Sequence, residues 1–324
     1  MKTILTAALA LLAVGVADAQ AQSYPSKPVT IIVPFAAGGP TDAMARALSD
    51  RMRQALGGQP IVIENVTGAA GSIAVTRAAR SAPDGYTISM GHLGTHVING
   101  AIYSLPYDLI EDFEPVALLG SNPMLIVSKN AVPAKNLTEL VAWLKANEQK
   151  ATIGTAGIGS GAHFSAVYFQ NLIGTKLPYV AYRGTGPALQ DLVAGQIDLI
   201  VDQASNSLPQ VQAGRIRAYG VTDTKRLATE PSIPTVDEAG LPGFHVAVWS
   251  ALWVPKGTPK DIIAKLNAAV VESLADPAVR KRLGDVGVDI PAREQLTPEA
   301  LRALQRSEAA KWWPIIKAAN VKPE

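Results

Sequence analysis

The stretch VTIIVPFAAGGPTDAMARAL, residues 29–48, contains an apolar run, a glycine pair and an amphipathic pattern in succession. This order predicts a β-strand, a tight loop and an α-helix, with Thr41 as the helix cap. Small residues let a loop backbone approach a ligand closely, and the first N–H groups of a helix have no partner inside it. Because these groups lie at the positive end of the helix dipole, the stretch predicts an anion site. The anion is either a nucleotide phosphate or another anion.

A second stretch repeats this pattern about 120 residues later. It reads ATIGTAGIGSGAHFSAVYF, at 151–169, and again places a small-residue loop between a strand pattern and a helix pattern. The repetition predicts two similar α/β domains, each presenting a helix N-terminus. If the domains face each other, the two termini meet across a cleft.

Strand-like and helix-like runs alternate along the rest of the chain, which predicts an α/β fold with largely parallel sheets. The expected strands are 28–33, 61–64, 86–90, 115–119, 124–128, 151–155, 178–182, 197–202, 215–221 and 246–254. The expected helices are 41–55, 71–80, 137–147, 162–173, 186–193, 205–213, 259–275, 277–284 and 297–318. We expect the chain to cross between domains at 115–128 and 215–225. The first domain then comprises 22–121 and 226–324, and the second comprises 122–225.

The first 21 residues have the composition of a secretory signal peptide. Lys2 precedes an apolar run from Ile4 to Val16, and small residues in ADAQAQ allow cleavage after Ala19 or Ala21. The run is shorter than the roughly 20 residues that a membrane-spanning helix needs. We therefore expect an exported, soluble protein.

Composition excludes several classes of partner and of stabilisation. The 324 residues include no cysteine, so disulfides and thiolate metal sites are excluded. The formal net charge is only +2 and the charges are scattered, which excludes the basic footprint of a nucleic-acid-binding protein. Ligand selectivity must therefore come from a local site.

The motifs argue against nucleotide binding, serine-hydrolase chemistry and metal binding. Gly157, Gly159 and Ala162 satisfy G-x-G-x-x-A, and Arg183 after the next strand suits a 2′-phosphate, but AAGGPTD in the first stretch does not fit this fingerprint. The sequence contains no P-loop motif, G-x-x-x-x-G-K-[ST], which excludes that type of nucleotide site. It also lacks G-x-S-x-G, the motif around the nucleophilic serine of many hydrolases. His92 and His96 have the i, i+4 spacing of metal ligands, but no glutamate follows His92, and the surrounding glycines favour a loop that lines a pocket or caps a helix.

Three further side chains are candidates for ligand contact. We expect His163 in the first turn of a helix, with a neutral imidazole that donates a hydrogen bond. Asp202 ends the strand pattern IDLIVDQ, where it binds a ligand amine, accepts from a hydroxyl or caps the next helix at Ser205. Trp249 lies in the apolar run VAVWSALWVP and either walls a pocket or packs in the core.

Several motifs together resemble one family of receptors. They are PFAAGGPTD (34–42), IENVTGAAG (63–71), APDGYT (82–87), YRGTGPALQDLVAGQIDLIVD (182–202), AGRIRAYGVTDTKR (213–226), PTVDEAGLPGF (234–244) and VPKGTPKDIIAKLN (254–267). In this order, and over essentially the whole mature chain, the sequence resembles the periplasmic substrate-binding proteins of tripartite tricarboxylate transporters, the Bug or TctC-like receptors.

The resemblance implies a two-lobed Venus-flytrap fold of the type II periplasmic-binding class. It also implies that loops of both lobes grip one carboxylate, that a membrane permease is the partner, and that the protein is a periplasmic monomer without catalytic activity, cofactor or metal. Many relatives carry lysine where Arg183 stands and prolines at Ala36 and Ala37. Carried over by position, the ligand-binding residues are Phe35, Ala37, Gly38, Gly39, Thr41, Asp42, His92, Thr95, Gly159, Ser160, Gly161, His163, Arg183, Thr185, Asp202, Gln203 and Trp249.

The residues leave the identity of the carboxylate open. Dicarboxylates, aromatic carboxylates and acidic amino acids all fit a cleft with few charged residues. A sensor subunit that signals to a membrane kinase and an exported NADP-dependent enzyme are the alternative functions.

Overall fold

The computed structural model describes residues 24–318. The expected signal peptide and both of its cleavage positions lie outside these residues. Within residues 24–318, no helix is both long enough and apolar enough to cross a bilayer.

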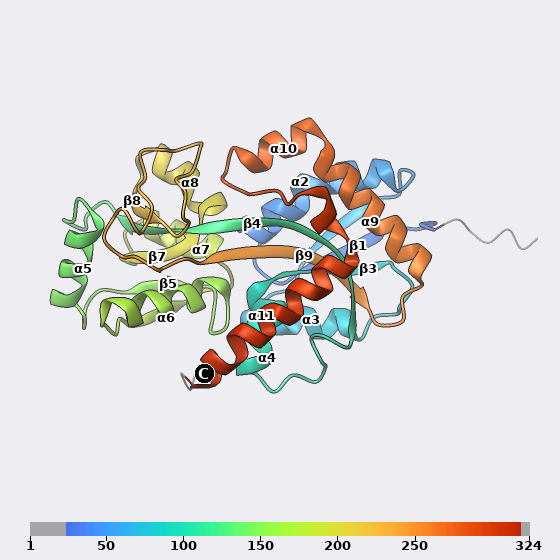
Figure 1. The fold of residues 1–324 in the computed structure, drawn as a ribbon, viewed down its shortest axis with the longest axis horizontal. Coiled ribbons are helices and arrows are strands. Elements are labelled where there is room, and N and C mark those ends of the chain that lie inside the picture. The colour runs from blue at the N-terminus through green and yellow to red at the C-terminus, as the bar shows by residue number, and fades with distance from the viewer. Residues whose placement is uncertain (1–23, 319–324) are drawn as a thin grey trace, which may run out of the picture.

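Strands and helices alternate as the sequence patterns predict (Figure 1). The strands are β1 (Val29–Val33), β2 (Ile61–Asn65), β3 (Thr87–His92), β4 (Phe113–Lys129), β5 (Ile153–Thr155), β6 (Tyr179–Ala181), β7 (Leu199–Gln203), β8 (Ile216–Val221) and β9 (Ala247–Pro255). The helices are α2 (Pro40–Ala55), α3 (Ser72–Ala79), α4 (Asn99–Ile102), α5 (Leu137–Ala146), α6 (Gly161–Ile173), α7 (Thr185–Val193), α8 (Ala204–Gln212), α9 (Lys260–Ala275), α10 (Pro277–Gly284) and α11 (Pro298–Ala318). Short 3₁₀ turns η1 (Ala69–Gly71) and η3 (Arg293–Leu296) and a π-helical turn η2 (Gly94–Ile98) complete the described elements.

One nine-stranded sheet connects these elements. Its strand order is β2-β1-β3-β9-β4-β7-β5-β6, and β8 also pairs with β4. The pairings β1–β2, β1–β3, β5–β6 and β5–β7 are parallel. The pairings of β9 with β3 and β4, and of β4 with β7 and β8, are antiparallel. The α/β fold class is confirmed, and two long strands supply the antiparallel centre.

These two long strands, β4 and β9, connect the two ends of the molecule, and Figure 1 shows them side by side across its middle. The first part of β4 pairs with β9, and its last part, from Met124, pairs with β7 and β8. The predicted interruption at Gly120–Pro123 is wrong. The turn-forming residues stay in one 17-residue strand because β9 pairs along this stretch, and shifts of register before Gly120 absorb the irregularity.

Apolar side chains divide between two lobes on either side of this crossing. Two clusters contain residues from Val29 to Leu119 and from Trp249 to Ile316, which we call the first lobe (24–121 and 249–318). Two other clusters contain residues from Met124 to Val248, which we call the second lobe (122–248). Because Leu227, Ile233 and Phe244 pack in the second lobe, we propose a domain boundary near Val248, not at 225/226.

Helix starts follow the sequence signals at two positions and depart from them at one. Asp276 ends α9 and caps α10, accepting hydrogen bonds from the N–H groups of Ala278 and Val279. Ser160 likewise caps α6. The predicted cap at Thr41 is wrong: Gly39 is the N-cap of α2, because Pro40, with its fixed φ and missing N–H, occupies the first helical position.

Candidate functional site

A small inner cavity lies between the two lobes, at the carboxyl ends of several parallel strands. Its volume is about 20 Å³. Loops that follow β1, β5 and β6 contribute to its wall, together with the last residues of β3 and β7. The lining residues are Phe35, Gly39, Pro40, Thr41, His92, Ala156, Ser160, Gly161, Ala162, Thr185 and Gln203. The two glycine-containing loops found in the sequence therefore meet at one place.

Helix N-termini surround this inner cavity. Helix α2 begins beside it at Pro40, α6 at Gly161 and α7 at Thr185, and Gln203 is the N-cap residue of α8. A helix start carries a partial positive charge and N–H groups without partners inside the helix, of which the one at His163 in α6 is bonded to Ser160 and the one at Ser205 in α8 to Asn122. Four such starts at one cavity create a positive local potential although no lysine or arginine is among the lining residues.

His92 is the titratable residue in the wall of the inner cavity. Burial lowers the pKa of His92 to about 4, so its imidazole is neutral near pH 7. Its Nδ1 accepts the N–H of Gly94 at 2.9 Å, and its ring stacks on Phe35 with centroids 5.1 Å apart. A neutral imidazole with an occupied Nδ1 carries its proton on Nε2, where it can donate to an anion.

The expected partner of His92, His96, lies elsewhere. Its ring stacks on Trp253 at 3.8 Å, and its nitrogens lie 3.0 Å from Thr95 Oγ1 and 3.3 Å from Ser89 Oγ. In residues 24–318 no cluster of three or more histidine, aspartate or glutamate side chains could hold a metal ion. The i, i+4 spacing is thus that of a strand end followed by a turn.

Asp42 stabilises the first glycine-containing loop through hydrogen bonds. Its Oδ2 accepts from Gly38 N at 3.0 Å and from Arg46 Nε at 2.9 Å, while Asn65 Nδ2 donates both to its Oδ1 and to the Phe35 carbonyl. Burial favours the neutral carboxyl, but the hydrogen bonds from Arg46, Gly38 and Asn65 together hold the pKa of Asp42 below its usual value. Asp42 therefore shapes the loop and does not line the cavity.

The second loop is fixed by its own helix. Ser160 Oγ accepts from His163 N at 3.1 Å, and His163 Nδ1 accepts from Gly159 N at 3.4 Å. Burial lowers the pKa of His163 to about 4, so the expected neutral imidazole is found, although toward this loop it accepts and does not donate. His163 is absent from the wall of the inner cavity.

Asp202 and Gln203, neighbours at the end of β7, have different environments. Gln203 lines the inner cavity, whereas Asp202 is fully buried behind it. Asp202 Oδ2 accepts from Ser207 Oγ at 2.5 Å and Asn206 Nδ2 at 2.7 Å, and its Oδ1 has no partner in the described part of the chain. Burial raises the pKa of Asp202 to about 6 against these hydrogen bonds. Asp202 does not cap α8 at Ser205, whose N–H is bonded to Asn122.

An outer chamber of about 630 Å³ adjoins the inner cavity and shares Phe35 and Ala156 with it. Both lobes line it. Arg183 lies in its wall and is exposed, with no ion-pair partner among residues 24–318. Its other lining residues are Ala36, Gly68, Ala69, Ala70, Gly71, Tyr103, Gly157, Ile158, Ala181, Tyr182 and Pro187.

The lobes touch around these cavities, so the structure is a closed form. Ala36 N donates to the Arg183 carbonyl at 3.0 Å, and Tyr103 OH donates to the Ile158 carbonyl at 2.5 Å. A Cβ on Gly186 would lie 3.0 Å from Gly39 N. Backbone therefore packs directly against backbone between the two loops.

The same packing argues against a dinucleotide on the second loop. A Cβ on Gly159 would lie 2.3 Å from Asn99 Oδ1 and 3.2 Å from the ring of Tyr103, and a Cβ on Gly157 would lie 3.6 Å from Ala70 N. First-lobe atoms therefore lie close against Gly157 and Gly159, the two positions where the fingerprint would need a pyrophosphate to approach the backbone.

Other predicted site residues lie outside the inner cavity. Thr95 Oγ1 bonds the backbone N and O of His92 and thereby fixes that turn. Trp249 is 6% exposed and packs in the first-lobe core, with its Nε1 unpartnered in the described chain. Ala37 and Gly38 line a separate outer surface beside α7 and α8.

Sequence reasoning selected Phe35 and Arg183 of the outer chamber but not its other lining residues. Ala69 and Ala70 adopt positive φ, which non-glycine residues rarely do, and they place this turn against the second lobe. The segment GAAG was visible in the sequence, but nothing in it indicated that its alanines line a chamber. Tyr103, after α4, carried no pattern either.

Comparison with known proteins identifies the family. The model of the tripartite tricarboxylate transporter family receptor matches residues 44–321. The chain belongs to this family. This family member is 41% identical over 303 residues to a protein of Agrobacterium vitis encoded in the TAR-I ttuE-ttuC′ intergenic region, covering 93% of this chain and 87% of that protein.

Solved structures show the same fold. MatC (Rpa3494) from Rhodopseudomonas palustris with bound malate is 42% identical and superposes with a TM-score of 0.87, covering 90% of this chain and all of that one. Rpa4515 of R. palustris with adipate is 32% identical, also with a TM-score of 0.87, covering 93% and 100% of the two chains. The predicted resemblance to the TctC-like receptors is confirmed.

Proposed function

We propose that this chain is a periplasmic solute-binding receptor that captures a small organic carboxylate between its lobes and delivers it, as a monomer, to the permease of a tripartite tricarboxylate transporter. The inner cavity carries this proposal. Its wall combines helix N-termini from both lobes with neutral polar side chains and lacks lysine and arginine. The family and the malate and adipate bound to the two structural relatives support a binding role over a catalytic one.

The mechanism follows from the cost of removing a carboxylate from water. An unpaired buried carboxylate is prohibitively unfavourable, so hydration must be replaced by fixed donors. The N–H groups at the starts of α2, α6 and α7, with Thr41, Ser160 and neutral His92, supply such donors without a counter-charge. Each lobe supplies only part of this set, so the ligand stabilises the closed arrangement.

The dimensions divide the ligand between the two cavities. The inner cavity, at about 20 Å³, has room only for the carboxylate head of a ligand. The body of the ligand therefore extends past Phe35 into the outer chamber of about 630 Å³. There Arg183 offers a guanidinium that can grip a second carboxylate with two parallel hydrogen bonds. This arrangement favours dicarboxylates among the three ligand classes that the sequence left open.

A thermal-shift titration with malate and adipate tests the proposal, because a ligand that binds only the folded state adds about 2.7 kcal/mol at a concentration of 100 Kd. The decisive variant is Gly39→Asp. Gly39 is an N-cap with φ −83°, a conformation that aspartate adopts readily, so the variant folds and places its own carboxylate at the start of α2. We expect the ligand shift to disappear.

Gly39→Asn is the matched control, because asparagine has nearly the same shape as aspartate but no charge. We expect this variant to retain part of the wild-type affinity for the ligand. Wild-type affinity in a folded Gly39→Asp protein would contradict the proposed position of the carboxylate.

A further inference from the structure

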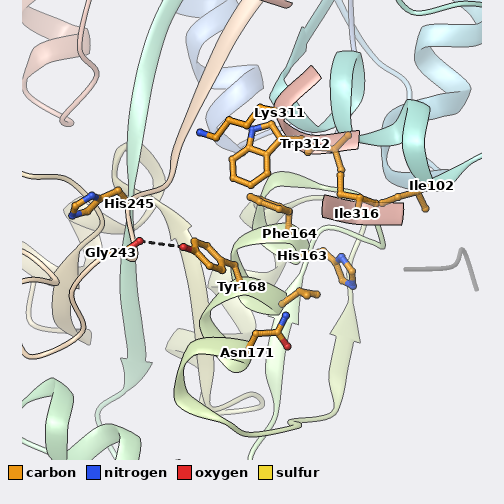
Figure 2. A pocket seen from close by; sticks show the side chains of 12 residues that line it. Ile102, His163, Phe164, Tyr168, Asn171, Gly243, His245, Lys311, Trp312 and Ile316 are labelled. Atoms are coloured by element: carbon orange, nitrogen blue, oxygen red, sulfur yellow. Dashed lines mark hydrogen bonds between the residues drawn. The ribbon is translucent and has the colours of Figure 1, made fainter. Parts of the chain in front are cut away.

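A second pocket between the lobes shares no lining residue with the inner cavity or the outer chamber. Its volume is about 360 Å³, and it lies between α6 of the second lobe and η2, α4 and α11 of the first (Figure 2). This volume is in the range of small-molecule sites, which are typically 300–1,000 Å³. The proposed receptor function leaves this pocket unused.

Aromatic and branched side chains form most of the pocket wall. Phe164 of α6 meets Trp312 of α11 edge-to-face, with centroids 4.6 Å apart, and Figure 2 shows this pair at the centre of the pocket. Ile98, Ile102 and Ile316 add aliphatic surface from the first lobe. Such a wall favours a flat apolar body.

Two polar groups of the pocket have unused hydrogen-bonding capacity. His163 is 5% exposed and lines the pocket, and its Nδ1 accepts from Gly159. The neutral ring therefore carries its proton on Nε2, which makes no hydrogen bond within residues 24–318. Lys311 lies over the Trp312 ring at 4.5 Å and has no ion-pair partner in the same part of the chain. Figure 2 shows Lys311 and His163 on opposite sides of the aromatic pair.

From these observations we infer that the pocket is a second ligand site, for a small aromatic acid. The ring lies against Phe164 and Trp312, an oxygen on the ring accepts from His163 Nε2, and the carboxylate at the other end pairs with Lys311. This assignment gives the Nε2–H of His163 an acceptor and gives Lys311 an ion-pair partner, and the aromatic body covers the apolar wall between them.

Methyl NMR of the full chain locates the binding of the probe 3-(4-hydroxyphenyl)propionate. We expect saturable shifts at the isoleucine methyls of the pocket, Ile98, Ile102 and Ile316, and none at Ile158, which lines the outer chamber. Shifts at Ile158 without shifts at the pocket isoleucines would overturn the inference, because the probe would then occupy the cleft.

A space-filling substitution tests the body of the site. Val167 lines the pocket and is half-buried, so Val167→Trp fills the cavity without removing packing. We expect it to weaken probe binding at least tenfold. Val193→Trp, at an exposed position of α7, is the matched control and leaves binding unchanged. Undiminished affinity in Val167→Trp would overturn the site, and circular dichroism checks that both variants are folded.

Charge and hydrogen bonding have their own controls. We expect Lys311→Met to lower the affinity for the probe about two- to fivefold at low salt, as for the loss of an exposed ion pair. Lys317→Met on the same helix should leave this affinity unchanged. The matching alcohol, 3-(4-hydroxyphenyl)propan-1-ol, lacks the carboxylate and should bind the wild-type protein more weakly than the probe by the same factor. The compound 3-phenylpropionate should also bind more weakly than the probe, because it lacks the ring oxygen. Equal affinities for all three compounds would overturn the assigned chemistry.

The chain's own C-terminal residues are the other candidate occupant of the pocket. Truncation after Ala318 removes them and so distinguishes them from a small-molecule ligand. We expect probe affinity within twofold of wild type. A large gain on truncation would show that residues 319–324 compete for the pocket, and would overturn the small-molecule assignment.

Discussion

Closure of the lobes should be sensitive to one methyl group at Gly186. This residue lies in the first turn of α7, and a Cβ there would approach Gly39 N at 3.0 Å and the carbonyl carbon and oxygen of Gly38 at 3.1 and 3.2 Å. Ordinary carbon contacts lie at 3.5–4.0 Å. Because the neighbouring atoms are backbone of the opposite lobe, Gly186→Ala requires the two loops to separate.

The expected magnitude follows from the cost of overpacking. Extra methyl groups in a well-packed interface cost about 1–3 kcal/mol, which corresponds to about a 5- to 150-fold loss of affinity when only the bound, closed form has the contact. In the open form the substitution replaces glycine with a better helix former, which contributes up to about 1 kcal/mol. The ligand-free variant should therefore melt at the wild-type temperature or slightly above it.

Calorimetric titration with the carboxylate that stabilises the wild type measures this loss, and small-angle scattering follows the contraction on ligand binding. Gly284→Ala at the end of α10 is the matched control, because nothing lies within 4 Å of its added Cβ. A folded Gly186→Ala protein that binds within twofold of wild type would refute the reasoning.

Four further outcomes are expected. Because the folded-state pKa of Asp202 is raised to about 6, its stabilising contribution is present below about pH 4 and is lost as pH rises through 6; relative to wild type, the unfolding free energy of Asp202→Asn should rise by about 2 kcal/mol from pH 4 to 7 in urea titrations, and an unchanged difference would contradict the buried, incompletely compensated carboxylate. Asp42→Ala leaves Gly38 N without its acceptor and removes one of the two acceptors of the Asn65 amide, and it should cost about 1–3 kcal/mol, whereas exposed Asp50→Ala on the same helix should cost almost nothing; equal losses in chemical denaturation would count against the role of Asp42. Arg183→Met should weaken adipate more than its monocarboxylate analogue hexanoate, and equal losses in calorimetry would remove Arg183 from the ligand's second end. The imidazole signals of His92 and His163 should not titrate between pH 8 and 5.5 in NMR spectra, in keeping with pKa values of about 4, and a midpoint near 6.5 would contradict their burial.

Local patterns predicted most elements because periodicity and punctuation agreed with tertiary packing. The strand before Gly39 and the break at Asp276 are examples. The long strand β4 was missed as a single element because pairing with β9 outweighs the turn signals at Gly120–Pro123, and no local signal reports that pairing. Likewise the turn from Gly94 to Ile98 looked like a loop, but its π-helical form is fixed by Thr95 bonding back to His92 and by burial of Val97 and Ile98.

The candidate site was predicted at the level of loops, not of side chains. Strand–glycine–helix units identify a helix start near an anion, because the chemistry belongs to the backbone. Which neighbouring side chain lines the cavity depends on the strand's orientation, since successive residues point to opposite faces. Asp202 and Gln203 were therefore both candidates, and only Gln203 lines the inner cavity. Asp42 was indistinguishable from a ligand contact because its partner Asn65 is 23 residues away.

The distribution of charge suggests why a receptor of this kind can release its ligand. Each ion pair in residues 24–318 joins two residues of the same lobe. The contacts between lobes that surround the two cavities are instead backbone approaches at Gly186 and hydrogen bonds from Ala36 and Tyr103.

A hydrogen bond exchanged with water contributes only about 0.5–1.5 kcal/mol, so each of these hydrogen bonds adds little to the stability of the closed form. A carboxylate that both lobes must share can then shift the population, because it interacts with the closed form far better than with either loop alone. Helix dipoles stabilise it within their first turns and lose most of this effect once the loops separate. The affinity for the ligand therefore depends on closure of the lobes, and any partner that opens the lobes also lowers this affinity.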